Sequence, residues 1–158
     1  AIHRHYRSLA NDLSLDNFGE PSPPVRHRVI IPVAGIHRGT LEALQYALSL
    51  SDDVTAVHIL LDPEQREIVE NKWRWWGKGV RLVVIESPYR TFLEPFLAYV
   101  DQLCAIQQTN ERLTIIVPQF TPKHWWHNLL HTQTAFWLRF ALLKKKGIVI
   151  TEVPYQVH

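Results

Sequence analysis

The chain has 158 residues, of which 46% are hydrophobic and 20% are charged, and its formal net charge is +2 at pH 7. These values predict one globular domain and exclude a disordered, collagen-like or coiled-coil chain. The small net charge argues against a protein that coats nucleic acid, so we expect no DNA or RNA partner. No apolar run reaches the 18 residues of a transmembrane helix. The single cysteine, Cys104, cannot form an internal disulfide and favours a reducing compartment.

The first 27 residues differ from the rest of the chain. Residues 1–8 carry two arginines, two histidines and no acid, and residues 19–24 contain three prolines. Because proline blocks helix at its own position and disfavours it just before, this stretch predicts a basic arm and a Pro-rich linker over residues 1–27. We expect one domain over residues 28–158. The chain contains no methionine, which predicts a processed protein or a segment of a longer one.

From residue 28 onward, β-branched runs alternate with amphipathic stretches. The expected strands are residues 28–34, 53–61, 80–86, 113–117 and 148–153, with Pro154 ending the last one. The expected helices are residues 38–50, 63–76 with Asp62 as N-cap, 89–108 and 122–143, and Pro95 either kinks the third of these or marks its true start. Strict alternation predicts an α/β fold, namely an open doubly wound five-stranded parallel sheet with helices on both faces. Ligands of such sheets bind beyond the carboxyl ends of the strands. The loops expected there are residues 33–40, 60–63, 86–90 and 117–123.

Two of these loops contain residues suited to an anion. Gly35 and Gly39 follow the first strand and allow close backbone approach at a helix N-terminus, although a plain strand-to-helix turn has the same composition. Arg90 follows the third strand, and we expect it in the first turn of the next helix, where its charge opposes the helix dipole. That placement predicts a phosphate or carboxylate partner. The alternative is an arginine that reaches solvent or an acid.

The segment after the fourth strand, residues 118–126, combines an amide, aromatic rings and Lys123. Such a loop can hold a base by stacking and edge hydrogen bonds. The polar residues 131–134 lie further along the expected helix, and a buried hydrogen-bonded cluster is their alternative explanation. His124, His127 and His131 share one helix face, but no carboxylate or thiolate ligand lies near them in the sequence, so we expect no metal.

Three further observations concern other functions. Trp73, Trp75 and Trp76 could stack on bases or lie at a membrane interface, and we expect at least two of them to pack against the sheet.

The charge is unevenly distributed along the chain, since residues 52–70 hold six acids and one base, whereas residues 112–151 hold six bases and no acid. The interpretations left open are solvated helix faces or an anion near the last third of the chain. No nucleophile motif or paired carboxylates are present, so we expect no enzyme.

The segment from Arg28 onward resembles the universal stress protein fold. Residues 28–155 are similar, more specifically, to the cytosolic C-terminal domain of KimA-type potassium importers of the amino acid–polyamine–organocation permease superfamily. The motifs that carry this resemblance are Val33-Ala-Gly-Ile36, Ser87-Pro-Tyr-Arg90, Pro118-Gln-Phe120, Trp125-Trp126, Leu130-His131 with Gln133-Thr134, and Val153-Pro-Tyr155.

The resemblance implies a function. It implies a cytosolic regulatory domain of a membrane potassium/proton importer, placed at the cytoplasmic face of the plasma membrane as part of an integral membrane protein. It implies a homodimer attached to the transmembrane portion of the same polypeptide, with cyclic di-AMP bound at or near the dimer interface to inhibit transport. No other cofactor is expected.

Loop position and resemblance together give the expected nucleotide-binding residues. We expect Arg90 and Lys123 at phosphate, and Gln119 and Phe120 at a base. The remaining expected residues are Gly35, Ile36, His131, Gln133 and Thr134.

Two alternatives stay open. One is a dimerisation domain of a related amino-acid permease that binds no ligand. The other is a stand-alone ATP-binding universal stress protein, which the absence of glycine between Gly79 and Gly147 disfavours because the usual triphosphate loop is glycine-rich.

Overall fold

The computed structural model describes residues 2–16, 19–20, 23, 25–121, 139 and 141–156, with the backbone alone described for residues 2–6, 119–121 and 156. The elements in chain order are α1 (Ile2–Leu13), β1 (Arg26–Pro32), α2 (Arg38–Leu50), β2 (Val54–Leu60), η1 (Pro63–Gln65), α3 (Arg66–Trp76), β3 (Arg81–Glu86), α4 (Leu93–Ala105), β4 (Glu111–Thr121) and β5 (Ile148–Gln156). Residues 141–143 are helical and lead into β5.

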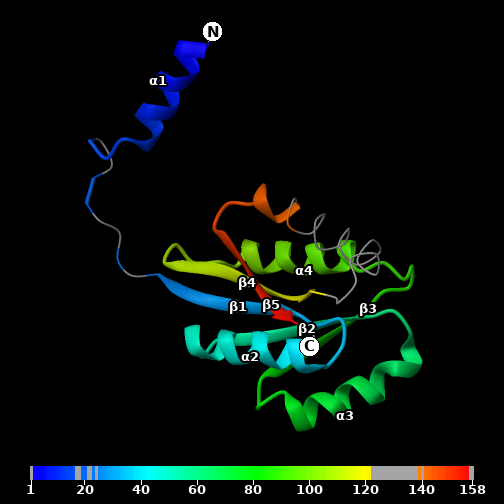
Figure 1. Cartoon of the computed structure of the whole chain (residues 1–158). Coiled ribbons are helices and arrows are strands. Elements are labelled where there is room, and N and C mark those ends of the chain that lie inside the picture. The colour runs from blue at the N-terminus through cyan, green and yellow to red at the C-terminus, as the bar shows by residue number, and fades with distance from the viewer. Residues whose placement is uncertain are drawn as a thin grey trace.

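The described strands form one five-stranded sheet in the order β3-β2-β1-β4-β5, and all neighbouring strands are parallel. The helices α2 and α3 lie on one face of this sheet and α4 lies on the other (Figure 1). This arrangement confirms the predicted open, doubly wound α/β fold. It arises because each parallel strand needs a crossover connection, and a sheet with two apolar faces needs helices on both of them.

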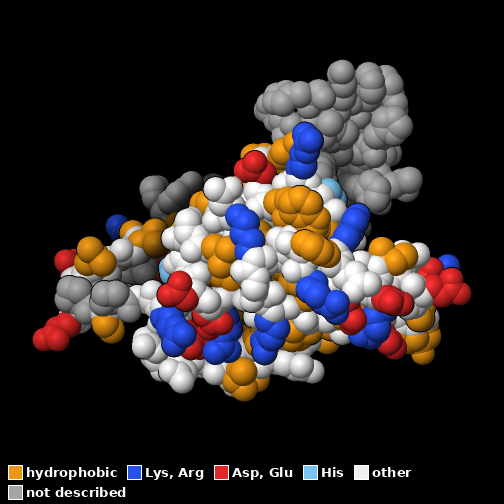
Figure 2. Space-filling view, turned by 90° about the horizontal axis from the view of Figure 1, so that it is seen from below, with side chains coloured by type: hydrophobic (Ala, Val, Ile, Leu, Met, Phe, Trp, Pro, Cys, Tyr) orange, Lys and Arg blue, Asp and Glu red, His pale blue; other side chains and the backbone are white. Residues whose placement is uncertain are grey.

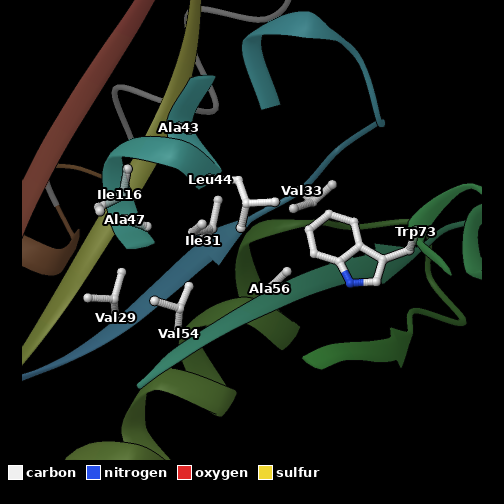
Figure 3. Packing of buried hydrophobic residues seen from close by; sticks show 10 residues of the cluster. All are labelled: Val29, Ile31, Val33, Ala43, Leu44, Ala47, Val54, Ala56, Trp73 and Ile116. Carbon is white, nitrogen blue, oxygen red and sulfur yellow. The ribbon is translucent and has the colours of Figure 1, made fainter. Parts of the chain in front are cut away.

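The strand β1 supplies side chains to both faces of the sheet. Val29 and Ile31 belong to a cluster with the small residues of α2, whereas Ile30 belongs to the cluster on the α4 side, and all three are at most 1% exposed. Figure 3 shows the first cluster, in which Leu44 of α2 lies beside Ile31 of β1. Because the side chains of β1 are buried on both faces of the sheet, its sequence is a continuous apolar run and does not alternate with polar residues.

Local signals place several element boundaries correctly. The predicted helix over residues 38–50 coincides with α2. Asp62 caps the turn that precedes α3 by accepting a hydrogen bond from the Glu64 N–H at 3.1 Å. Gly77 follows α3, and a Cβ placed on it would lie 2.5 Å from Nε1 of Trp73. Here glycine is needed for close packing, since its φ of −74° suits any residue.

Two strand predictions were wrong. The fourth strand does not end at Val117, because β4 continues to Thr121 and pairs with β5 along this whole extension. The fifth strand passes through Pro154 and ends at Gln156. Proline is tolerated there because β5 is an edge strand, so a missing N–H on its outer side breaks no ladder.

The prediction that at least two of the three tryptophans of α3 pack against the sheet was also wrong. Trp73 is 6% exposed and its indole N–H donates to the main-chain oxygen of Val80 at 2.7 Å. Trp75 is 85% exposed and Trp76 is 55% exposed. Trp75 lies two residues after Trp73, about 200° around the helix axis, so it points away from the face that Trp73 buries.

Candidate functional site

The carboxyl edge of the sheet has a step at β1. Pro32, the last residue of β1, pairs with Val57, which in turn pairs with Val83. Both β2 and β3 run on for three more residues, which is roughly 10 Å of strand. On the other side, the register that pairs Ile30 with Ile115 puts Pro32 level with residue 117, so β4 projects four residues further. The central strand β1 therefore ends before its neighbours at this edge.

This step coincides with the switch in strand order. The chain leaves β1 towards β2 on one side and later returns to β4 on the other, so the connections diverge at the carboxyl end of β1. Loops that diverge in this way leave room for a ligand in doubly wound sheets. Gly35 and Ile36 lie in the loop directly after β1, and the backbone of Gln119 and Phe120 lies in the projecting part of β4. The structure thus brings these four predicted residues to the two sides of the switch.

Hydrogen bonds from buried groups fix the loop after β1. His58 on β2 is 7% exposed, and its Nδ1 lies 2.7 Å from the main-chain oxygen of Val33. A carbonyl oxygen only accepts, so Nδ1 carries the proton. Further along, the buried Thr40 hydroxyl donates to the main-chain oxygen of Gly35 at 2.7 Å. The loop is held from both of its ends.

His37 completes this loop as the N-cap of α2. Its Nδ1 accepts a hydrogen bond from the Thr40 N–H at 3.2 Å and lies 3.0 Å from the Thr40 hydroxyl. Burial lowers the pKa of His37, a main-chain hydrogen bond partly opposes this shift, and the positive charge of Lys72 adds to it. The neutral ring is the form that a helix N-terminus requires, because a protonated Nδ1 cannot accept from the N–H.

Arg90 lies in a turn, not in a helix as predicted. Its main-chain N–H donates to the oxygen of Ser87 at 3.1 Å, and α4 begins three residues later at Leu93. Its φ is +53°, in the left-handed region that costs a non-glycine residue about 1–2 kcal/mol. The buried Ser87 stabilises the turn, since its Oγ accepts from the Thr91 N–H at 3.0 Å. Strain of this kind is concentrated at functional sites.

The guanidinium of Arg90 is exposed and makes no hydrogen bond or ion pair with another residue among those that the structure describes. Beside it, Tyr89 is 84% exposed. Tyr89 lies within the Ser87-Pro-Tyr-Arg90 motif but is not among the residues expected at the nucleotide. Its exposure beside the left-handed Arg90 makes it a further candidate, and this juxtaposition is visible only once the turn is known.

The structure does not describe all of the predicted residues, and it places others to one side of the switch. Lys123, His131, Gln133 and Thr134 lie outside the described residues, as do His124 and His127. Arg90 follows β3, two strands from β1, so its turn lies to one side of the switch. A Cβ on Gly35 would meet only His37 Cδ2, at 3.7 Å, an ordinary contact. The packing of the described residues therefore does not require glycine there.

Two hollows among the described residues lie elsewhere. One, of about 250 Å³, is lined by residues around Leu142 and Ile148, and a shallower one of about 500 Å³ lies near Arg112 and Lys146. In the part of the chain described here, no three His, Cys, Asp or Glu side chains group as a metal site would require. The described helices are all too short or too polar to cross a membrane.

The fold and its carboxyl edge define a universal-stress-protein-like α/β domain, and comparison with known proteins makes this class specific. Residues 25–155 match the family described as the KimA potassium transporter C-terminal domain. The potassium transporter KimA of Bacillus subtilis strain 168 is 38% identical over 157 residues, which cover 98% of this chain and 26% of that protein. The chain therefore belongs to the family of KimA C-terminal domains and spans about a quarter of the relative's length.

Proposed function

We propose that this domain regulates a potassium/proton importer by binding cyclic di-AMP at its carboxyl edge, at or near a homodimer interface, and thereby inhibits transport. Membership of the KimA family supports the link to potassium transport, because the matched relative is a potassium transporter. The importer acts in the plasma membrane, and this domain faces the cytoplasm.

The observation that carries the proposal is the strained turn at Arg90. Its backbone is held at φ +53° and its guanidinium is exposed and unpaired among the described residues. A guanidinium is planar and carries several N–H donors, so an exposed guanidinium without a described partner is suited to bind a phosphate through charge-assisted hydrogen bonds. The adjacent Tyr89 offers an exposed ring on which a purine can stack.

The step at β1 supports a ligand larger than one phosphate. The loop of Gly35 and Ile36 forms the low part of the step, and the projecting β4 backbone of Gln119 and Phe120 forms one side. Lys123, His131, Gln133 and Thr134 complete the proposed site from the segment that follows β4. A ligand with two phosphates and two-fold symmetry suits an isologous interface to which each subunit contributes the same residues.

Calorimetric titration of the chain tests the proposal, with cyclic di-AMP as ligand and ATP, AMP and cyclic di-GMP as controls. We expect one cyclic di-AMP to bind per two chains, and Arg90→Ala to weaken binding by about 1.5–3 kcal/mol if the phosphate contact is direct. Arg74→Gln is the control, since Arg74 is also exposed but lies in the last turn of α3, away from the carboxyl edge. A folded, dimeric chain that releases no heat with any nucleotide would instead identify a dimerisation domain without a ligand.

A further inference from the structure

The amino edge of the sheet, opposite the proposed nucleotide site, is rich in both cations and exposed apolar side chains. Residues 71–85, which form the end of α3, the following turn and most of β3, contain four bases and no acid. Trp75 and Trp76 are exposed on the same segment. The face that carries α2 and α3 shows apolar side chains among basic and acidic side chains (Figure 2).

Segments distant in sequence extend this edge. In parallel sheets the connections that lead into each strand share one edge, so the turns before β3, β4 and β5 lie together with the start of β1. The exposed bases of these connections and strand starts are Arg26, Lys78, Arg81, Arg112, Lys144 and Lys146. Ile106 and Leu143, which are 65% and 67% exposed, add apolar surface. We call this set, together with Trp75 and Trp76, the basic edge.

The acids near the basic edge are mostly neutralised. Arg28 lies 3.4 Å from Asp53 and 3.6 Å from Glu111, which pairs both carboxylates with one guanidinium. Asp101 pairs with Lys145. Among the described residues near this edge, Asp52 in the turn before β2 and Glu20 in the segment ahead of β1 remain as exposed acids, against the six exposed bases named above, so the surface presents an excess of positive charge.

We propose that the basic edge docks on an anionic lipid bilayer. Exposed tryptophans flanked by lysine and arginine are suited to the boundary between headgroups and acyl chains, because the ring has an apolar body and a polar N–H. The open hollow of about 500 Å³ between Arg112 and Lys146, with Gln107 and Thr109 on its wall, can accept a lipid headgroup.

The topology makes this orientation possible. In the matched family this domain is C-terminal, so the connection to the rest of those potassium transporters runs through the segment ahead of β1. That segment enters the sheet at Arg26, on the basic edge (Figure 1). A bilayer at the basic edge leaves the opposite, carboxyl edge open to the cytoplasm. The docking surface and the nucleotide site therefore do not compete.

Co-sedimentation of the chain with vesicles tests the proposal. The vesicles are phosphatidylcholine alone or phosphatidylcholine with about one-third phosphatidylglycerol, and we expect binding to the anionic vesicles that salt weakens. Each of Lys78→Gln, Arg112→Gln and Lys146→Gln should lower the partition coefficient about five-fold. The double variant Trp75→Ala/Trp76→Ala should lower it at least about ten-fold.

Matched variants on the carboxyl edge are the controls. Arg38→Gln removes an exposed charge and Tyr89→Ala/Leu61→Ala removes exposed apolar surface there, and we expect neither to change vesicle binding. Equal binding to neutral and anionic vesicles, or equal losses in both sets of variants, would overturn the proposal. So would a lipid-free dimer that Trp75→Ala/Trp76→Ala converts to monomer while vesicle binding is unchanged, because the tryptophans would then face a second copy.

Discussion

The imidazole of His58 and the main-chain oxygen of Val33 are joined by a buried hydrogen bond of 2.7 Å that ties β2 to the start of the loop after β1. The same loop is tied to α2 by Thr40, whose hydroxyl donates to the oxygen of Gly35. The position of Gly35 and Ile36 at the step in the sheet therefore depends on side chains that the proposed ligand need not touch.

Replacing His58 should weaken both the fold and the proposed site. His58→Ala leaves the Val33 oxygen buried without this donor, so we expect a loss of about 1–3 kcal/mol in the free energy of unfolding. His58→Gln retains a donor and should lose less. Urea denaturation measures both variants. Equal stability of His58→Ala and the parent would show that this bond contributes nothing to the fold.

Arg90 can be tested with two variants whose effects on stability differ. Arg90→Gly relieves about 1–2 kcal/mol of left-handed strain and costs about 0.5–1 kcal/mol in backbone entropy, whereas Arg90→Ala retains the strain. We therefore expect the glycine variant to unfold at higher urea than the alanine variant. Both should lose the same affinity for cyclic di-AMP if the guanidinium makes the contact. Unchanged affinity in both folded variants would remove Arg90 from the site.

Gly77 should tolerate no side chain while Trp73 is present. Its backbone suits alanine, but the new Cβ would lie 2.5 Å from the indole nitrogen. We expect Gly77→Ala to destabilise the chain by about 1–3 kcal/mol, as overpacking of a core does. Trp73→Phe removes the indole nitrogen, so the double variant should lose less than the sum of the two single losses. Strict additivity in thermal melts would contradict the steric explanation.

The lowered pKa of His37 predicts a pH dependence of stability. The unfolded chain takes up a proton near the ordinary histidine pKa of about 6.5, whereas the folded chain resists protonation of His37 to lower pH. As the pH falls below that value, proton uptake by His37 favours the unfolded chain, so the free energy of unfolding decreases. Above that value His37 is neutral in both states and has no such effect. His37→Ser keeps a capping oxygen and should show a weaker fall between pH 7.5 and 5.5. Parallel stability curves for the two proteins would refute this assignment.

Cys104 should react slowly with thiol reagents. Burial raises the pKa of its thiol, nearby Lys145 partly offsets this rise, and Asp101 adds to it. Since the thiolate is the reactive form, we expect slower alkylation at neutral pH than for a model thiol. Lys145→Gln removes the offset and should slow the reaction further. A rate equal to that of glutathione would contradict this prediction.

Much of the fold follows from the order of residues along the chain. Continuous β-branched runs such as Val29–Ile31 alternate with helices whose ends are marked by Asp62 and Gly77, and this alternation suffices for a doubly wound parallel sheet. The carboxyl-end loops, with Gly35 and Arg90, follow from the same topology, because parallel strands end at one edge.

The tertiary structure decided the features that depend on contacts between neighbouring strands and helices. Residues 119–121 extend β4 because β5 pairs with them, and Pro154 stays in β5 because its outer edge has no partner strand in the described sheet. The left-handed turn at Arg90 and the exposure of Trp75 beside the buried Trp73 depend on which face of each element meets the core. Propensity and periodicity describe one segment at a time, whereas these outcomes are set by contacts between segments far apart in the chain.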